Sequence, residues 1–145
     1  MFRMATLGSA ALALLLLAAP AQAQNSADIL QIEAVPDAVS NVLQHGANNR
    51  ALIEQRALEA GALDPQNEAK ISQKGSDNLA AIKQEGEDNS AAIIQNGSKN
   101  EGSIWQQYSG NNFTLQQSGN GMSAKIEQFG TGLPGAPPIT ITQSK

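Results

Sequence analysis

Between residues 69 and 134 the hydrophobic and polar positions of this chain repeat every eleven residues. In each unit a small residue, an aliphatic residue and a glutamine occupy alternate positions, although Phe113 once replaces the small residue. The aliphatic residues are Ile71, Ile82, Ile93, Ile104, Leu115 and Ile126, and the glutamines are Gln73, Gln84, Gln95, Gln106, Gln117 and Gln128. Alternation with a period of two is typical of a strand with one buried face. The pattern therefore predicts one short strand in each unit.

The residues that follow each predicted strand are typical of turns. Glycine stands two positions after the glutamine, at Gly75, Gly86, Gly97, Gly119 and Gly130, and asparagine stands three positions further on, at Asn78, Asn89, Asn100 and Asn111. Both residue types adopt positive φ angles more readily than the others. We therefore expect a compact arc between successive strands.

Weaker copies of the same pattern precede the regular array. Residues 40–61 hold two degenerate repeats, and residues 62–68 predict an inserted loop before the array begins. The stretch from Arg50 to Leu63 is also rich in Ala, Leu, Glu and Arg, so a helix there is an alternative. Residues 24–39 are weakly specified, although Ala27-x-Ile29-x-Gln31 follows the alternation.

After the array the eleven-residue pattern is interrupted by a proline-containing segment. Pro137 and Pro138 lie in residues 135–145, and they are followed by the alternating residues Ile139, Ile141 and Gln143. Proline cannot donate a hydrogen bond to a β-ladder. This segment therefore predicts a proline-containing detour followed by a terminal half-repeat.

Stacking is the way in which such short units can bury their apolar side chains. Two half-repeats on opposite sides of a flattened coil give a rung of 22 residues, and successive rungs lie about 4.8 Å apart. Alternate units then share a sheet. We predict an all-β fold, an amyloid-competent β-solenoid of strand-turn-strand rungs.

The glutamines of this solenoid point inward together with the alanine and isoleucine columns. A buried amide without a partner costs about 1–3 kcal/mol. In-register stacking removes this cost, because Gln73 can pass a hydrogen bond to Gln95 one rung further on, and the arc asparagines can form a similar ladder. Disordered low-complexity sequence is the alternative, but it would not keep aliphatic residues in phase with glutamines over six units.

Residues 1–23 have the features of a secretory signal peptide. Arg3 precedes an apolar run from Leu7 to Ala19, and Ala21-Gln22-Ala23 matches a cleavage site. The run is shorter than the roughly 20 residues of a membrane-spanning helix. We exclude these residues from the predicted fold and expect an exported chain that starts at Gln24.

The remaining residues offer little chemistry for catalysis or ligand binding. The formal net charge is −4 with both signs interspersed, so the chain has no basic surface for nucleic acid. His45 is the single histidine and there is no cysteine, which leaves no recognisable metal ligands or catalytic constellation. The acidic residues of one arc, Glu85, Glu87 and Asp88, are not repeated in the others. We expect no enzyme activity, no cofactor, no metal and no small-molecule substrate.

Three apolar residues lie outside the inward columns, at Ile94, Trp105 and Phe129. Trp105 and Phe129 are candidates for interface anchors between filaments or toward a partner. Scattered apolar residues on a surface are also common without any function. Both interpretations stay open at this point.

The repeats resemble the curlin family, whose members build bacterial curli fibres. The family motif, Gln-x-Gly-x-x-Asn-x-Ala followed by a second Gln, is matched at three places, Gln73 to Gln84, Gln84 to Gln95, and Gln44 to Gln55. The resemblance implies an extracellular, cell-surface amyloid fibre of the biofilm matrix, in which the chain pairs with itself and with a related curlin subunit in cell adhesion. It also implies export through the periplasm and the outer membrane by a secretion pore with accessory proteins. The uniform units with few aromatics most resemble the minor, nucleating subunit.

Two other functions remain as alternatives. The chain could be a major curlin subunit itself, or a monomeric β-solenoid that binds a surface or ligand with one flat outward face. A binding face of that kind requires a regular outward column, whereas the column Ser72, Lys83, Ile94, Trp105, Gln116 and Glu127 is irregular. A fibre subunit that grows by strand addition at its edges is therefore the leading hypothesis.

Overall fold

The computed structural model describes residues 3–6, 11–16, 24–32, 38–56, 67–130 and 137–145. Its strands are β1 (Arg3–Thr6), β2 (Ala11–Leu16), β3 (Ser26–Ile32), β4 (Val39–Ala47), β5 (Arg50–Arg56), β6 (Glu68–Ser76), β7 (Leu79–Glu85), β8 (Ser90–Ser98), β9 (Glu101–Gln107), β10 (Asn112–Asn120), β11 (Ser123–Phe129) and β12 (Ile139–Ser144). The described residues contain no helix, and therefore none that could span a membrane. The fold is all-β.

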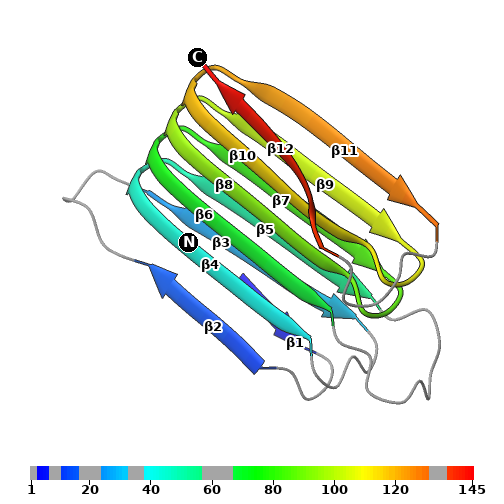
Figure 1. The fold of residues 1–145 in the computed structure, drawn as a ribbon. Coiled ribbons are helices and arrows are strands. Elements are labelled where there is room, and N and C mark those ends of the chain that lie inside the picture. The colour runs from blue at the N-terminus through cyan, green and yellow to red at the C-terminus, as the bar shows by residue number, and fades with distance from the viewer. Residues whose placement is uncertain (1–2, 7–10, 17–23, 33–37, 57–66, 131–136) are drawn as a thin grey trace.

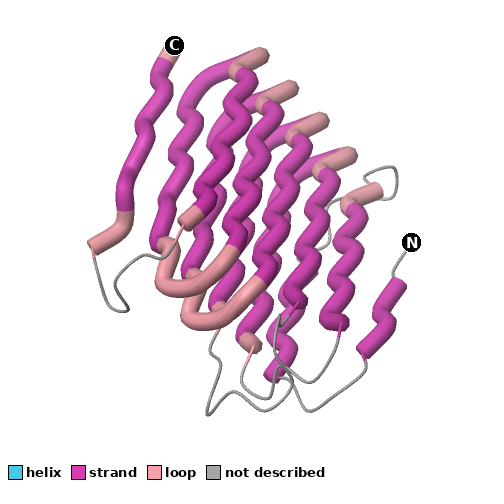
Figure 2. Tube along the Cα trace, turned by 90° about the vertical axis from the view of Figure 1, so that its right-hand side faces the viewer, coloured by secondary structure: helices cyan, strands magenta, loops and turns pink. Residues whose placement is uncertain are grey.

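The strands form two parallel sheets that face each other (Figure 1). One sheet has the order β1-β3-β5-β7-β9-β11 and the other has the order β12-β10-β8-β6-β4-β2. Successive strands of the chain alternate between the sheets, so the backbone winds as a flattened coil with β12 at one end of the stack (Figure 2). The predicted β-solenoid is confirmed.

The strands stack in register. Gln73 on β6 pairs with Gln95 on β8, which pairs with Gln117 on β10. The opposite sheet places Gln84 beside Gln106 in the same manner. Stacked partners are 22 residues apart in sequence, which confirms the predicted rung. Alternate units share a sheet, as the repeat predicts.

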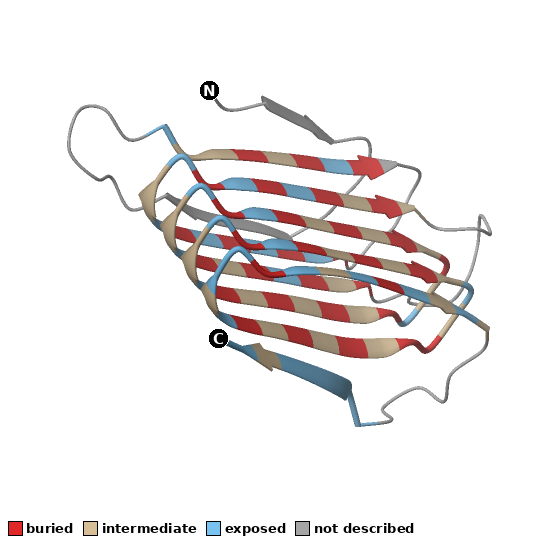
Figure 3. Cartoon of the chain, turned by 90° about the horizontal axis from the view of Figure 1, so that it is seen from above, coloured by how far each residue is buried: buried red, intermediate tan, exposed pale blue. Residues whose placement is uncertain are grey.

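The core is a single layer of side chains between the two sheets. Burial alternates along the strands, and buried and less buried residues form the bands visible in Figure 3. The isoleucines of the aliphatic column are almost fully buried, with Ile82 and Ile93 only 1% and 0% exposed. Each such side chain contributes about 1.5–3 kcal/mol by leaving water. The sheets are close together, since a Cβ atom on Gly102 would lie 2.9 Å from Leu115 Cδ2.

Several expectations for the N-terminal half need correction. Arg50–Arg56 is strand β5, so the helical alternative is wrong there, and residues 57–66 lie outside the described part. The weakly specified segment 24–39 contains β3, in which Ala27, Ile29 and Gln31 are buried. The weak signal arose because residues 24–39 lack the glycine that follows the strand in the regular units.

Two further segments join the solenoid against expectation. The predicted loop 62–68 ends too late, because Asn67 is buried and Glu68 begins β6. Residues 1–23 were excluded from the fold, yet β1 and β2 pair with β3 and β4 in the full chain. The half-repeat expected in residues 135–145 forms β12, whereas residues 131–136 lie outside the described part.

The arc glycines permit close approach of one rung to the next. Gly75 has a φ angle of 117°, and a Cβ atom there would lie 1.9 Å from the carbonyl oxygen of Gly97. The same relation holds between Gly86 and Tyr108, where the distance to the carbonyl oxygen would be 2.0 Å. Tyr108 itself occupies a glycine position with a φ angle of 74°. A side chain in place of Gly75 or Gly86 would therefore force the stacked arcs apart.

Replacing Gly75 by alanine should destabilise the fold more than replacing Gly130. Both glycines have positive φ angles, which cost an alanine about 1–3 kcal/mol. A Cβ atom on Gly130 meets nothing within 4 Å, whereas one on Gly75 meets backbone that cannot move without opening the stack. Denaturant titration followed by circular dichroism measures both free energies of unfolding. Equal losses in the two variants would show that rung contact is not the cause.

Candidate functional site

Two columns of inward-facing glutamines run between the sheets from β3 and β4 to β11 and β12, and all but the last member of each column are buried. We call them the glutamine ladders. Within each ladder the Nε2 atom of one glutamine donates to the Oε1 atom of the glutamine in the next strand of the sheet, at 2.8–3.0 Å. The ladders are Gln44, Gln73, Gln95, Gln117, Gln143 in one sheet and Gln31, Gln55, Gln84, Gln106, Gln128 in the other.

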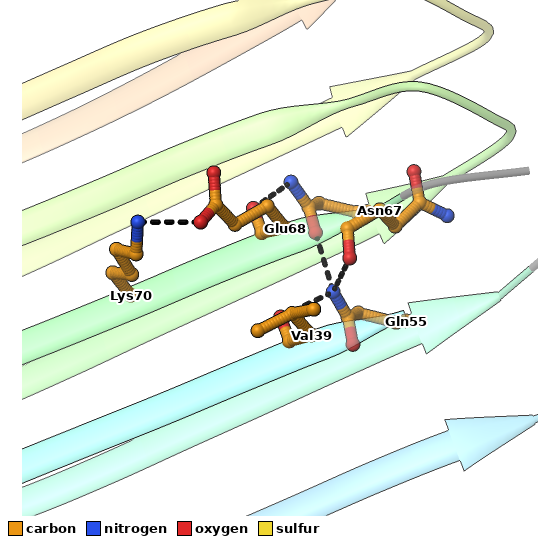
Figure 4. Close-up of polar contacts among 6 residues, drawn as sticks. Val39, Gln55, Asn67, Glu68 and Lys70 are labelled. Carbon is orange, nitrogen blue, oxygen red and sulfur yellow. Dashed lines mark hydrogen bonds and ion pairs between the residues drawn. The ribbon is translucent and has the colours of Figure 1, made fainter. Parts of the chain in front are cut away.

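Each interior Nε2 atom also donates to a backbone carbonyl of the facing sheet. Gln95 donates to Leu79 O at 2.9 Å, and Gln73 donates to Arg50 O at 3.0 Å. Gln55 likewise donates to Gln84 Oε1 and to Asn67 O, both at 3.0 Å, and Figure 4 shows its contact with Asn67. Both amide hydrogens are thus satisfied inside the core, which removes the desolvation cost of the buried group.

The facing carbonyls also give each ladder a direction. A flipped amide would place Oε1 against a carbonyl oxygen, where two acceptors repel each other. The Nε2 atoms of the interior glutamines therefore all point toward the C-terminal end of the stack. At the N-terminal end Gln31 Oε1 and Gln44 Oε1 are buried without a hydrogen-bond partner.

The asparagines of the arcs satisfy backbone groups rather than copying the glutamine pattern. Asn78 Oδ1 accepts the backbone N–H of Asn100 at 3.1 Å, and Asn78 Nδ2 donates to Gly97 O at 2.8 Å. Asn89 Oδ1 similarly accepts the backbone N–H of Asn111 at 3.0 Å. Each asparagine thereby fixes the arc of the following rung. Amide contacts between asparagines occur in addition, for example from Asn111 to Asn89 at 3.1 Å.

The sequence pattern missed two members of the asparagine columns. Asn67 Oδ1 accepts the backbone N–H of Asn89 at 3.0 Å, and Asn25 Oδ1 accepts that of Asn49 at 3.0 Å. Both lack the preceding glycine at the usual spacing. The residues that follow these asparagines could have identified them. Each asparagine stands two positions before a small inward residue, as Asn78 stands before Ala80.

The outward residues form no regular surface. Strand pairing divides them between the sheets, with Ser72, Ile94 and Gln116 in one column. Lys83, Trp105 and Glu127 lie in a column of the other sheet. Neither column repeats one chemical group, so neither matches a periodic ligand.

The aromatic residues outside the core pack against each other. The rings of Trp105 and Phe129 lie edge to face with centroids 5.1 Å apart, and Lys83 Nζ lies 5.2 Å from the Trp105 centroid. Lys83 also forms an ion pair with Glu85 at 2.9 Å. Phe129 is 53% exposed, so part of this cluster is accessible to a partner.

Acidic residues and histidine do not gather into a candidate metal centre. In the described part of the chain no group of three or more His, Cys, Asp or Glu side chains is suited to hold a metal ion. His45 is exposed on β4, next to the buried Gln44. The glutamine ladders are therefore the most specific feature of the molecule.

Replacing Gln95 and Gln117 together by leucine should strongly impair folding and assembly. The double substitution removes the acceptor of Gln73 Nε2 and the donors to Leu79 O and Glu101 O. Each orphaned group costs about 1–3 kcal/mol. The rate of assembly, followed by thioflavin fluorescence, measures the effect.

Gln116→Leu is the matched control, because Gln116 lies on the outward face of β10, next to the ladder residue Gln117, and is not buried. It makes the same chemical change without touching a ladder. Assembly at equal rates by the control and the double variant would count against the ladder as the stabilising feature.

Comparison with known proteins agrees with this geometry. A family model described as the curlin associated repeat matches residues 66–93 and 86–130, which cover β6 to β11. No curated protein and no solved structure matches the chain. Curlin repeats are typical of curli fibre subunits, a family of structural proteins without enzyme activity that assemble with themselves into extracellular fibres. Residues 66–130 therefore consist of repeats of the curlin family.

Proposed function

We propose that this chain is a secreted structural subunit of a curli-like amyloid fibre, which nucleates a related major curlin or assembles together with it. The observation that carries this proposal is the open stack. Both sheets are parallel and in register, and each ends in a strand with one unpaired edge, at β11 and β12. Such edges are templates for a further strand of the same sequence pattern.

Strand addition continues every interaction that holds the stack together. A new rung brings backbone hydrogen bonds, an aliphatic residue for the core and a glutamine for the ladder. The repeat makes these groups arrive in the correct register, because Gln and Ile recur at the same offsets in each strand. Fibre growth is thus an intermolecular version of the folding of one chain.

The outward charges support growth along the stack instead of sideways association. Ion pairs join residues two positions apart on one strand, such as Lys70 with Glu68 and Lys125 with Glu127. Charged residues on an exposed sheet disfavour uncontrolled β-addition. Charges that slow the addition of further strands suit a nucleating subunit, because nucleation requires a template more than fast elongation.

The rest of the proposal concerns location and partners. Residues 1–23 act as the signal peptide, and the exported chain crosses the outer membrane through a secretion pore with accessory proteins. The fibre serves in cell adhesion and in the biofilm matrix. The chain acts without enzyme activity, cofactor, nucleic acid or small-molecule substrate.

The chain starting at Gln24 should form fibres that diffract at about 4.7–4.8 Å and about 10 Å, the spacings between strands and between sheets. Fibre diffraction of the purified protein tests this. A chain that remains monomeric for days at high micromolar concentration would exclude the fibre and favour the monomeric binding module.

Preformed seeds of this chain should shorten the lag phase of a major curlin. An equal mass of the unassembled Gln95→Leu, Gln117→Leu double variant is the control, because that variant lacks continuous ladders. Thioflavin kinetics provide the measurement. Rapid assembly of this chain alone, with no effect on the major curlin, would identify it as a major subunit itself.

A further inference from the structure

Charged side chains are distributed unequally between the two outer faces of the solenoid. In one sheet every strand from β3 to β11 carries outward Asp, Glu, Lys or Arg residues. Among the described strands from β4 to β12 of the other sheet, β6 alone carries such residues, which are Glu68, Lys70 and Lys74. We call the outward side of this second sheet the low-charge face. Charges that disfavour sideways association are therefore concentrated on the opposite face.

Uncharged polar side chains dominate the low-charge face from β8 to β12. Thr114, Gln116 and Thr142 are typical of its outward positions, which are half-buried or exposed in the described chain. Hydroxyl and amide side chains of this kind can interdigitate between two facing sheets, as they do in steric zippers. The outward residues of these three described strands include no ionised group that would lose its water in such a contact. The low-charge face is therefore suited to pack against a second β-sheet.

The charges on β6 are complementary to themselves. Glu68 and Lys74 lie on the outward side at equal distances before and after Ile71. A twofold axis that runs parallel to the stack and passes over Ile71 places Glu68 of one copy opposite Lys74 of another, and Lys74 opposite Glu68. The same axis places Lys70 opposite Ser72, and Lys70 already forms an ion pair with Glu68 of its own chain. Two copies can therefore meet at β6 with opposite charges facing each other.

We propose that two filaments of this chain pair side by side through their low-charge faces, about a twofold axis parallel to the filaments. Each strand of the face then lies over the same strand of the neighbouring filament, so Thr114 lies opposite Gln116. The two sheets pack about 10 Å apart, the usual distance between facing sheets. This pairing rests on the proposed fibre function, and it names a second filament of the same chain as the partner of the low-charge face.

The same symmetry is unfavourable for the opposite face. On β5 the corresponding outward residues are Arg50 and Arg56, which lie at equal distances before and after Ile53. A twofold axis over Ile53 would therefore place Arg50 of one copy opposite Arg56 of the other. Like charges that face each other across an interface oppose association. The low-charge face is therefore the side that pairs.

The charges on β6 also select the relative direction of the two filaments. A twofold axis along the strands would turn one filament upside down and keep every outward column opposite itself. Wherever β6 then met β6, Glu68 would lie opposite Glu68 and Lys74 opposite Lys74. Of the two axes, the one parallel to the filaments brings opposite charges together. The paired filaments therefore run in the same direction.

The size of the low-charge face makes the pairing a property of filaments. The strands β4, β6, β8, β10 and β12 give one subunit a face about 24 Å high and about 20 Å wide, or about 480 Å². A stable interface buries about 800 Å² on each partner. Two single chains fall short of this area, whereas a filament repeats the contact in every subunit and the contacts act together. We expect chains that are monomeric before assembly and filaments that are paired after it.

Exchange of the charges on β6 tests the pairing. Glu68→Lys and Lys74→Glu each place like charges opposite each other, whereas the double variant restores opposite charges with their positions exchanged. Scanning transmission electron microscopy of the fibres measures mass per unit length. A single filament that grows by strand addition holds one chain per about 24 Å, and a pair holds twice that mass. We expect the unsubstituted chain and the double variant to form pairs, and each single variant to lose half of the mass per unit length.

Arg50→Glu and Glu101→Lys are the matched controls. They make the same changes of charge at exposed positions of the opposite sheet. Their filaments should stay paired, so loss of pairing in these controls would indicate an effect of net charge and overturn the inference. The double variant supplies a further control, because it lacks the ion pair between Glu68 and Lys70 just as Glu68→Lys does.

A lysine in the uncharged part of the low-charge face provides an independent readout. Thr114→Lys places a charge at the centre of the contact on β10, and we expect it to give single filaments. Ser103→Lys introduces the same charge at a half-buried outward position of β9 in the opposite sheet and should leave the filaments paired. Equal mass per unit length in the two variants would contradict pairing through the low-charge face.

The outcomes separate this inference from the proposed function. Fibres of the unsubstituted chain that hold one chain per about 24 Å would overturn the pairing and leave the fibre subunit intact. Single variants of β6 that stay paired would overturn the twofold contact between copies of β6. Failure of the unsubstituted chain to form fibres would overturn the proposed function together with the pairing.

Discussion

The structure depends on a constraint imposed by buried amides. A glutamine side chain that is 0% exposed between two sheets, such as Gln84 or Gln95, can reach only the glutamines above and below it and one carbonyl opposite. A shift of a strand by two residues would keep the same face inward, but it would place each glutamine beside an aliphatic residue and leave the amides unpaired. Apolar burial favours many registers of a repetitive chain, whereas the amides favour one.

Satisfying the amides requires a narrow core, and that in turn limits the other positions. The sheets must be close enough for Gln95 Nε2 to reach Leu79 O at 2.9 Å. Small residues such as Ala80 and Ala91 therefore share the core with the isoleucines. Irregular residues are accepted where they point outward or into spare space, as with the exposed Tyr108 in a glycine position. The regularity of the sequence is thus a consequence of the ladder geometry.

Much of this architecture could be predicted because tandem repeats convert sequence spacing into spatial contact. The glutamine of one strand meets the glutamine 22 residues later, so the partners of Gln73 and Gln84 follow from counting. Counting fails where the spacing changes to 29 residues, between Gln55 and Gln84, which is why Asn67 was assigned to a loop. The direction of the ladders could not be predicted either, since it depends on carbonyls in the opposite sheet.

The same ladders that stabilise the interior leave the ends incomplete. A column of hydrogen bonds with one direction must finish with an unpaired donor at one end and an unpaired acceptor at the other, whatever its length. A solenoid that functions alone requires caps of different chemistry at these points. In this chain β12 repeats the Ile-x-Ile-x-Gln pattern to the last strand, while outward ion pairs such as Lys83 with Glu85 keep the sheet faces hydrophilic. Stability inside the subunit and growth along its axis therefore have one physical origin.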